Sequence, residues 1–282
     1  MKLGVAGLLG DGSAEAARNV REMGFSAASW HLRDLDLAED QEALLRVRDV
    51  MEEEELELCQ LLPPLYPSLV HPDAGIREAG VEALARVVRA AVVLGAGSVY
   101  VRPGSLNDAG PWTPHPLNHA PETRARLVES LRALVPHAEE AGIPLAIEGH
   151  VVSPLHTPAV VREVLDAVGS PMLRFNADPV NFIGTLDQAY DSGALLDELF
   201  DLLGDVIVMA HAKDVTVGER LVVHIEECLP GQGFLDQETF LRRFEACCPR
   251  GVVLIEHLPP ERVPEARRAL LEFAARAGLS FQ

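Results

Sequence analysis

Short apolar runs alternate with longer amphipathic segments along nearly the whole chain. The short runs are typical of strands buried on both faces, and the longer segments carry the periodicity of helices. The apolar runs predict strands at residues 2–7, 25–31, 56–62, 98–102 and 251–258, with three more that lead to Glu148, Asp178 and His211. The amphipathic segments predict helices at residues 14–23, 40–55, 75–94, 122–141, 157–168, 186–203 and 264–278.

Steady strand and helix alternation predicts a parallel sheet. At 282 residues, with no linker-like stretch and 48% hydrophobic residues, the chain fits one α/β domain over residues 1–282, a (β/α)8 TIM barrel. No apolar run reaches the roughly 18 residues that a membrane span needs. The opening MKLGVAGLLGDG is typical of a first strand and its loop rather than of a secretory signal, so we expect a cytoplasmic protein without a membrane partner.

Four predicted strands end on a side chain that can bind a metal ion or move a proton. Glu148, Asp178, His211 and Glu256 follow one another at intervals of 30, 33 and 45 residues. One such residue alone is explained equally well as a cap of its own strand or a partner of a neighbour. Because a (β/α)8 barrel spends about 30 residues per unit and has its active site at the carboxyl ends of the strands, the spacing predicts that all four converge.

Charge and cysteine content narrow the class of partner. The formal net charge of -19 argues against nucleic acid, whose binders carry basic patches. The four cysteines show neither metal-finger nor disulfide-framework spacing, which indicates ordinary reduced thiols. We therefore expect a small-molecule substrate.

The four strand-end residues form a hard, mostly oxygen ligand set. Such a set suits manganese, magnesium or cobalt better than structural zinc. Four protein ligands leave two octahedral positions for a sugar carbonyl and its neighbouring hydroxyl, where the ion would stabilise the enediolate formed when the α-proton leaves. Glu148 and Glu256 are the predicted acid/base pair for that proton.

Two long loops and three further side chains are candidates for substrate binding. Residues 104–121 predict a mobile lid, and an irregular segment is expected between His211 and Gly233. Arg102 ends its strand and either anchors a substrate oxygen or pairs with a carboxylate of the site. Trp30 either lines a sugar pocket or belongs to the core. Arg220 lies in the irregular segment.

The segments LAIEGH, NADPVNF, AHAKD with the later PGQG, and LIEH resemble the motifs of the xylose isomerase-like barrel superfamily, over nearly the whole chain. The resemblance to its ketose 3-epimerase-like members implies one divalent ion held by the four strand-end residues, whose two glutamates double as bases. It also implies substrate contacts at His150, Lys213 and Arg220, although a structural role explains His150 and Lys213 nearly as well.

The chain departs from many relatives at Asn181, where they have a histidine. In epimerase-like members that histidine contacts substrate, and in endonuclease-like members it binds a further metal. An amide can hydrogen-bond a sugar hydroxyl but is a poor zinc ligand, which weakens the reading as a multi-zinc DNA-repair enzyme.

The predicted function is a metal-dependent sugar isomerase or epimerase that acts on a sugar, sugar phosphate or polyol through an enediolate, with manganese favoured over magnesium, cobalt or zinc. The alternatives are a metal-dependent dehydratase or lyase acting on a keto-sugar or inosose, and a sugar-binding barrel without turnover. The sequence leaves open which sugar is used, whether it is phosphorylated, and whether the chain forms a homo-oligomer.

Overall fold

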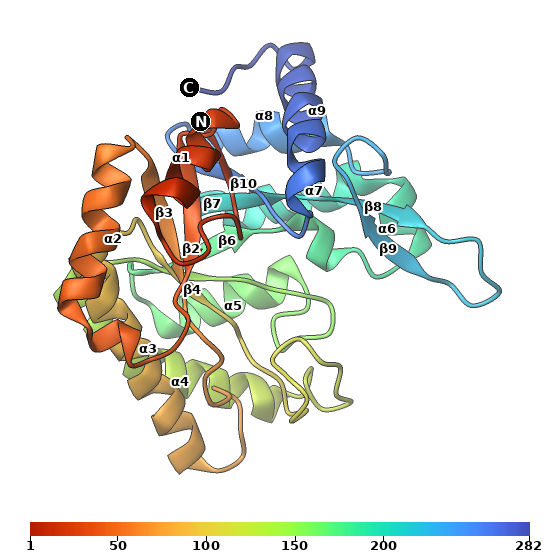
Figure 1. The fold of residues 1–282 in the computed structure, drawn as a ribbon. Helices are drawn as coiled ribbons and strands as arrows, with labels where there is room; N and C mark the ends of the chain where they lie inside the picture. The colour runs from red at the N-terminus through yellow and green to blue at the C-terminus, as the bar shows by residue number, and fades with distance from the viewer.

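Eight parallel strands close into a barrel in the computed structural model, which describes residues 1–282 (Figure 1). The order around the barrel is β1-β10-β7-β6-β5-β4-β3-β2. The strands are β1 (Lys2–Val5), β2 (Ala27–His31), β3 (Glu57–Leu62), β4 (Val99–Val101), β5 (Leu145–Ile147), β6 (Leu173–Ala177), β7 (Ile207–Ala212) and β10 (Val252–Ile255). The predicted fold class, a single (β/α)8 barrel, is confirmed.

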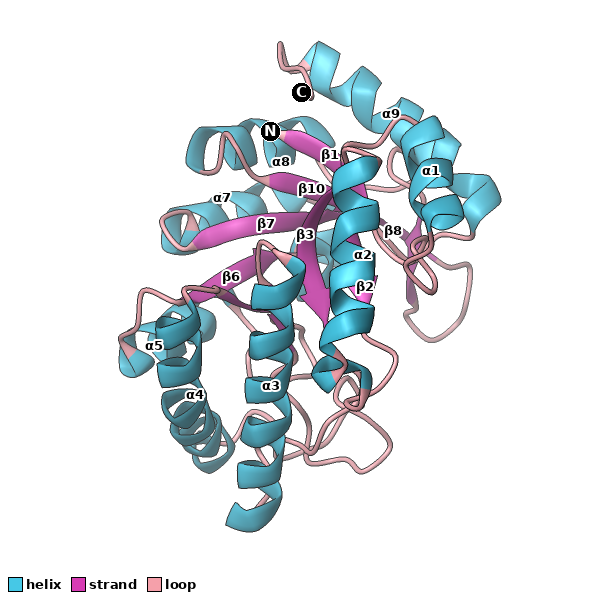
Figure 2. Ribbon diagram, turned by 60° about the vertical axis from the view of Figure 1, so that its left-hand side comes forward, coloured by secondary structure: helices cyan, strands magenta, loops and turns pink.

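Helices surround the barrel on its outer side (Figure 2). They are α1 (Ala14–Glu22), α2 (Gln41–Glu53), α3 (Ala74–Leu94), α4 (Pro121–Ala141), α5 (Pro158–Val168), α6 (Leu186–Tyr190), α7 (Ser192–Leu203), α8 (Gln237–Cys247) and α9 (Val263–Arg276). Short 3-10 turns are η1 (Leu37–Glu39), η2 (Pro179–Phe182) and η3 (Pro260–Arg262). None of the helices is both long and apolar enough to cross a membrane.

Pairing of the first strand with the last closes the barrel. Val5 of β1 is in register with Ile255 of β10, and every residue of β10 is buried. Burial on both faces explains why this strand is an unbroken apolar run rather than an alternating one. The backbone N–H of Gln282 donates to the carbonyl of Met1 at 3.0 Å, so the two chain ends lie together, as Figure 1 shows.

The helix predicted over residues 186–203 is two helices. The break is at Asp191, whose φ of -128° and ψ of 67° are not helical. Ser192 next to it is buried and bonded to a distant segment: its hydroxyl donates to the Phe234 carbonyl at 3.3 Å and accepts from the Asp236 N–H at 2.9 Å. This tertiary anchor overrides a helical pattern that is continuous in the sequence.

The segment after His211 is more regular than predicted. It forms an antiparallel hairpin of β8 (Asp214–Val217) and β9 (Ile225–Cys228), which projects from the barrel in Figure 1. Helix α8 follows the hairpin and is likewise absent from the predicted elements. The prediction of an irregular segment up to Gly233 was therefore wrong for the two hairpin strands.

Asp214 ties the base of this hairpin to the PGQG segment. Its fully buried carboxylate accepts four backbone N–H bonds, from Val215 at 2.8 Å, Gly231 at 2.8 Å, Gly233 at 3.2 Å and Leu235 at 2.9 Å. A Cβ at Gly233 would lie 2.1 Å from the Val215 carbonyl oxygen, so only glycine fits there. The hairpin base is thus a fixed part of the barrel rim.

Candidate metal centre

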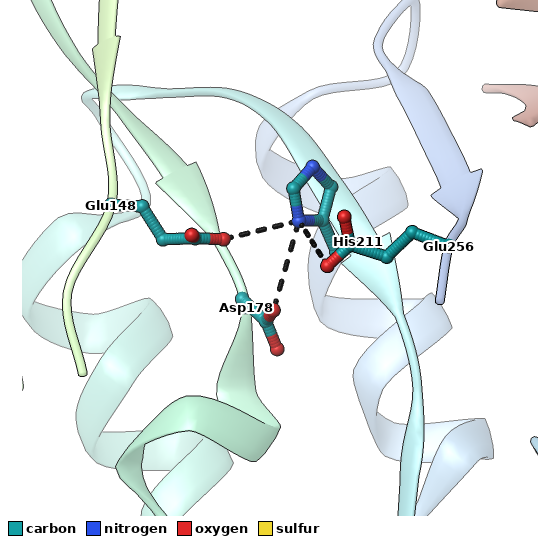
Figure 3. A group of neighbouring side chains, drawn as sticks. All are labelled: Glu148, Asp178, His211 and Glu256. Atoms are coloured by element: carbon teal, nitrogen blue, oxygen red, sulfur yellow. Dashed lines mark ion pairs between the residues drawn. The ribbon is translucent and has the colours of Figure 1, made fainter. Parts of the chain in front are cut away.

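Four strand ends bring Glu148, Asp178, His211 and Glu256 together (Figure 3). Glu148 directly follows β5, Asp178 follows β6, His211 lies near the end of β7, and Glu256 follows β10. One ligand atom from each side chain lies within 4.8 Å of the others. The structure therefore contains the convergence that the spacing of these residues predicts.

The imidazole of His211 lies among the three carboxylates. Its Nδ1 is 3.0 Å from Glu148 Oε1, 2.9 Å from Glu256 Oε1 and 3.7 Å from Asp178 Oδ2. Burial alone would lower the pKa of His211, but Glu256 and the other two carboxylates outweigh burial and raise this pKa well above its usual range. The cluster thus favours a positive charge at its centre.

Asp178 provides a test of whether a metal ion fits. Its side chain is fully buried, and although Oδ2 pairs with Lys213 Nζ at 2.7 Å, Oδ1 has no partner among the protein atoms. Buried carboxylates are costly unless they are paired or coordinate a metal. Three carboxylates and one imidazole form a hard donor set that suits manganese or magnesium. These residues therefore fit a divalent cation.

Lys213 follows β7 and extends into the same cluster. Its Nζ lies 2.7 Å from Asp178 Oδ2 and 2.5 Å from Glu256 Oε1. Burial favours the neutral amine, but Asp178 and Glu256 outweigh it and raise the pKa of Lys213 well above its usual range. Burial alone would raise the pKa of Glu256. The neighbouring cations His211 and Lys213 outweigh burial and hold this pKa well below its usual range.

Two residues that the sequence analysis missed hold Glu148. The Tyr100 hydroxyl, from β4, donates to Glu148 Oε2, and the Asn176 side-chain amide, from β6, donates to Oε1 at 2.9 Å. Burial and the neighbouring Glu148 charge raise the pKa of Tyr100 well above its usual range, so the phenol remains a donor. Asn176 had a sequence signal: it is polar within an apolar strand, two residues before Asp178 and therefore on the same face.

A cavity of about 490 Å³ opens over the cluster. His150, Asn181, Lys213 and Arg102 line it, together with Trp112 from residues 104–121. The Trp112 ring centre lies 5.8 Å from that of His150, so residues 104–121 reach the cavity through Trp112, and their role as a mobile lid stays a prediction.

Asn118 fixes the same loop over the barrel. Its side chain is buried and donates to the Val152 carbonyl at 2.8 Å, while its Oδ1 accepts from the Leu106 N–H at 3.0 Å. The loop is therefore bonded both to itself and to the segment that follows Glu148.

Arg102 borders the cavity but pairs with no carboxylate. Its guanidinium donates to the carbonyls of Pro63 at 3.2 Å and Pro64 at 3.3 Å, and lies 5.8 Å and 5.3 Å from the ring centres of Tyr66 and Tyr100. Of the two roles considered for Arg102, the ion pair with the site is absent.

The structure does not bring Arg220 to the cavity. It lies in the exposed turn of the hairpin and bonds Glu226 at 3.1 Å. Trp30 is buried in the core, its Nε1 donates to the Gly10 carbonyl at 3.0 Å, and it does not line the metal cavity.

Two further cavity residues were not chosen from the sequence. His31 lies at the end of β2, the strand-end position that marked the four cluster residues, and Glu227 lies in β9, within a segment predicted to be irregular. Glu227 Oε2 lies 3.0 Å from His257 Nδ1, which links the hairpin to the strand end that carries Glu256.

The family model described as "Xylose isomerase-like TIM barrel" matches residues 17–273. No curated protein sequence matches the chain. Among solved structures, a D-tagatose 3-epimerase-like protein is similar, with 19% identity, a TM-score of 0.78, and 99% of this chain and 98% of that chain covered.

Two other solved structures are similar over the same length. A D-psicose 3-epimerase, determined in the presence of D-fructose, has 16% identity and a TM-score of 0.74 over 98% of this chain and 99% of that chain. A xylose isomerase-like TIM barrel protein from Mycobacterium smegmatis, in complex with magnesium, has 18% identity and a TM-score of 0.74 over 98% of each chain. At these identities the likeness establishes the fold.

Proposed function

The chain belongs to the xylose isomerase-like TIM barrel family, and on that premise we propose that it is a divalent-metal-dependent sugar isomerase or epimerase. The observation that carries the proposal is the buried cluster of Glu148, Asp178, His211 and Glu256, whose two glutamates line a cavity. Structural neighbours whose titles name ketose 3-epimerases support a carbohydrate substrate.

The four clustered side chains would hold the ion. A bound divalent cation supplies charge stabilisation to substrate oxygens that become negative during the reaction. We favour manganese, because the donor set is hard and mostly oxygen. A neighbour in complex with magnesium supports a divalent ion of this class.

Glu148 and Glu256 are the proposed proton carriers. Strands β6 and β7 separate β5 from β10 around the barrel, so the two carboxylates approach the cavity from opposite flanks. One carboxylate takes the proton from the carbon beside the substrate carbonyl, the C–H electrons form the carbon–carbon double bond of the enediolate, and the carbonyl π electrons move to the carbonyl oxygen. The other, in its protonated form, returns a proton to the opposite face of the same carbon, which restores the carbonyl and gives an epimer. Protonation of the neighbouring carbon instead, with transfer of the hydroxyl proton from one oxygen to the other, gives an isomer.

Substrate contacts are assigned to the cavity residues with free polar atoms. His150 Nδ1 accepts from the Val152 N–H at 3.1 Å, so Nε2 is the nitrogen left for a sugar hydroxyl. Asn181 and Lys213 offer an amide and an ammonium group. Arg102 also lines the cavity, but its guanidinium already donates to backbone carbonyls. Arg220 is not proposed as a substrate contact, because it lies outside the cavity.

Elemental analysis of protein purified without chelator tests the metal site. We expect about one divalent ion per chain, lost in Asp178→Ala and in His211→Ala. Unchanged metal content in both variants would refute the ligand assignment.

Proton exchange tests the reaction class. Incubation of a sugar panel in heavy water should give deuterium in a product of unchanged formula. Loss of water from a keto-sugar or inosose would instead indicate a dehydratase or lyase, exchange with none of the sugars would indicate a binding protein, and cleavage of abasic DNA would support a nuclease.

A further inference from the structure

A second cavity of about 520 Å³ lies beside the proposed metal cavity. The two cavities share His31, at the end of β2. They also share the loop that follows β1: Gly7 lines the metal cavity, and Gly10 and Gly12 line the second. The two spaces are therefore adjacent on the face of the barrel where the strands end.

One face of α2 forms an apolar wall of the second cavity. Ala43, Val47 and Val50 lie three and four residues apart and so share that face, and Leu37 extends the wall. Trp30 lies next to this wall and continues it, since a Cβ on Gly12 would be 2.9 Å from Val47 Cγ2 and 3.4 Å from Trp30 Cε2. An apolar wall of this kind suits the C–H face of a ring.

The charged residues of the second cavity are already paired. Arg33 Nε bonds Asp34 at 2.9 Å, and Arg46 bonds Glu42 at 2.7 Å. The Asp11 carboxylate, also in the lining, accepts from the Ser13 N–H at 3.0 Å. Each guanidinium thus has a carboxylate beside it, and Asp11 adds a third carboxylate, so the charges around the cavity do not sum to a positive site for a phosphate and an uncharged ligand fits it better.

We propose that the second cavity binds an uncharged ring joined by a glycosidic bond to the reacting sugar, so that the substrate is a glycoside rather than a free monosaccharide. This inference rests on the proposed function of the neighbouring site. The ring is either a second sugar or an aryl group, since both offer an apolar face to α2.

Tryptophan fluorescence gives a readout of binding that does not depend on turnover. The chain has two tryptophans, and Trp112→Phe leaves only Trp30, which lines the second cavity. Titration of this variant with disaccharides and phenyl glycosides should change the Trp30 emission and saturate, whereas the matching monosaccharides should leave it unchanged. Which of the two glycoside classes saturates first identifies the ring. Equal responses to glycosides and monosaccharides, or no response to either glycoside class, would overturn the proposal.

A blocking substitution tests the same cavity in catalysis. Ala43→Phe places a ring against the wall formed by α2, and Val92→Phe is the matched control, because Val92 is 51% exposed on α3 and lines neither cavity. We expect the ratio of kcat/KM for the glycoside to that for the monosaccharide to exceed tenfold in the wild type. That ratio should fall at least tenfold in Ala43→Phe and stay unchanged in Val92→Phe.

The two measurements separate this inference from the proposed function. If glycosides change the Trp30 emission to saturation but no sugar undergoes proton exchange, the isomerase or epimerase function is refuted and glycoside binding in the second cavity is supported. If monosaccharides are turned over without any preference for glycosides, and the Trp30 emission does not respond, glycoside binding in the second cavity is refuted and the proposed function is supported. If Ala43→Phe does not fold, Val50→Phe on the same face replaces it.

Discussion

Replacement of either glutamate by glutamine separates the two roles assigned to these residues. Glutamine keeps the size and one ligand oxygen of the side chain but removes the basic carboxylate. Glu148 Oε2 accepts from Tyr100, and Glu256 Oε1 lies 2.5 Å from Lys213 and 2.9 Å from His211. Both substitutions therefore remove a basic carboxylate, but Glu148 loses it beside a neutral phenol and Glu256 loses it beside two cationic side chains.

The expected loss of turnover is large in both variants. A general acid or base typically contributes 10²- to 10⁴-fold, which corresponds to about 3–5 kcal/mol of activation free energy. The folded state should suffer more in Glu256→Gln, because Lys213 and His211 each lose a close carboxylate. Breaking a buried ion pair costs roughly 3–5 kcal/mol. In Glu148→Gln one orientation of the amide still accepts the Tyr100 hydroxyl, so its melting temperature should fall less.

The assay is proton exchange and product formation by NMR in heavy water, at a metal concentration that saturates each variant. Each single variant keeps one base, so it should exchange the substrate proton that this base reaches without completing the reaction. The double variant should lose less than the product of the two single losses, because both groups serve one proton relay.

Near wild-type turnover in both single variants at saturating metal would refute the two-base mechanism. The glutamates would then be ligands only, and the base would have to be found among His150, Lys213 and His257. The melting temperature of each variant is the control that separates lost chemistry from lost folding.

Three further outcomes are expected. Tyr100→Phe removes the hydrogen-bond donor to Glu148 and should lower kcat about 10- to 100-fold with little change in KM, because a hydrogen bond to a charged group contributes about 1.5–3 kcal/mol. An unchanged kcat would show that the hydroxyl is dispensable. Manganese at about 100 times its Kd should stabilise the fold by about 2.7 kcal/mol in a thermal melt, and equal stabilisation of Asp178→Ala would place the ion elsewhere. Burial raises the pKa of Cys228 to about 12 and that of Cys247 to about 11, so both remain neutral thiols below those pH values. Their alkylation rate, followed by mass spectrometry, should therefore keep rising about tenfold per pH unit beyond pH 9. A plateau near pH 9 would contradict this expectation.

The barrel and the positions of its strand-end residues could be predicted because they depend on local patterns. A strand buried on both faces must be apolar, so a carboxylate at its end is conspicuous, as Glu148 and Glu256 show. The parallel arrangement then places all the strand ends on one side of the barrel.

Other features depend on contacts between segments far apart in the sequence. Asp191 breaks a helix because Ser192 is bonded to Phe234 and Asp236, which no local pattern reveals. The hairpin strands are only four residues each, and the turn between them, GERLVVH, lacks the Asn-Gly or Asp-Gly pair of a tight hairpin. Tyr100 lies in an apolar run where a tyrosine is ordinary.

The four-bond anchor at Asp214 makes the hairpin tip a place where the chain can be modified. The carboxylate fixes the base of the hairpin immediately after Lys213, whereas Leu221, Val222 and Val223 at the tip are exposed. These three tip residues can thus be shortened, lengthened or replaced by a fluorophore attachment site while Glu227 of β9 and the active-site side of the rim keep their place.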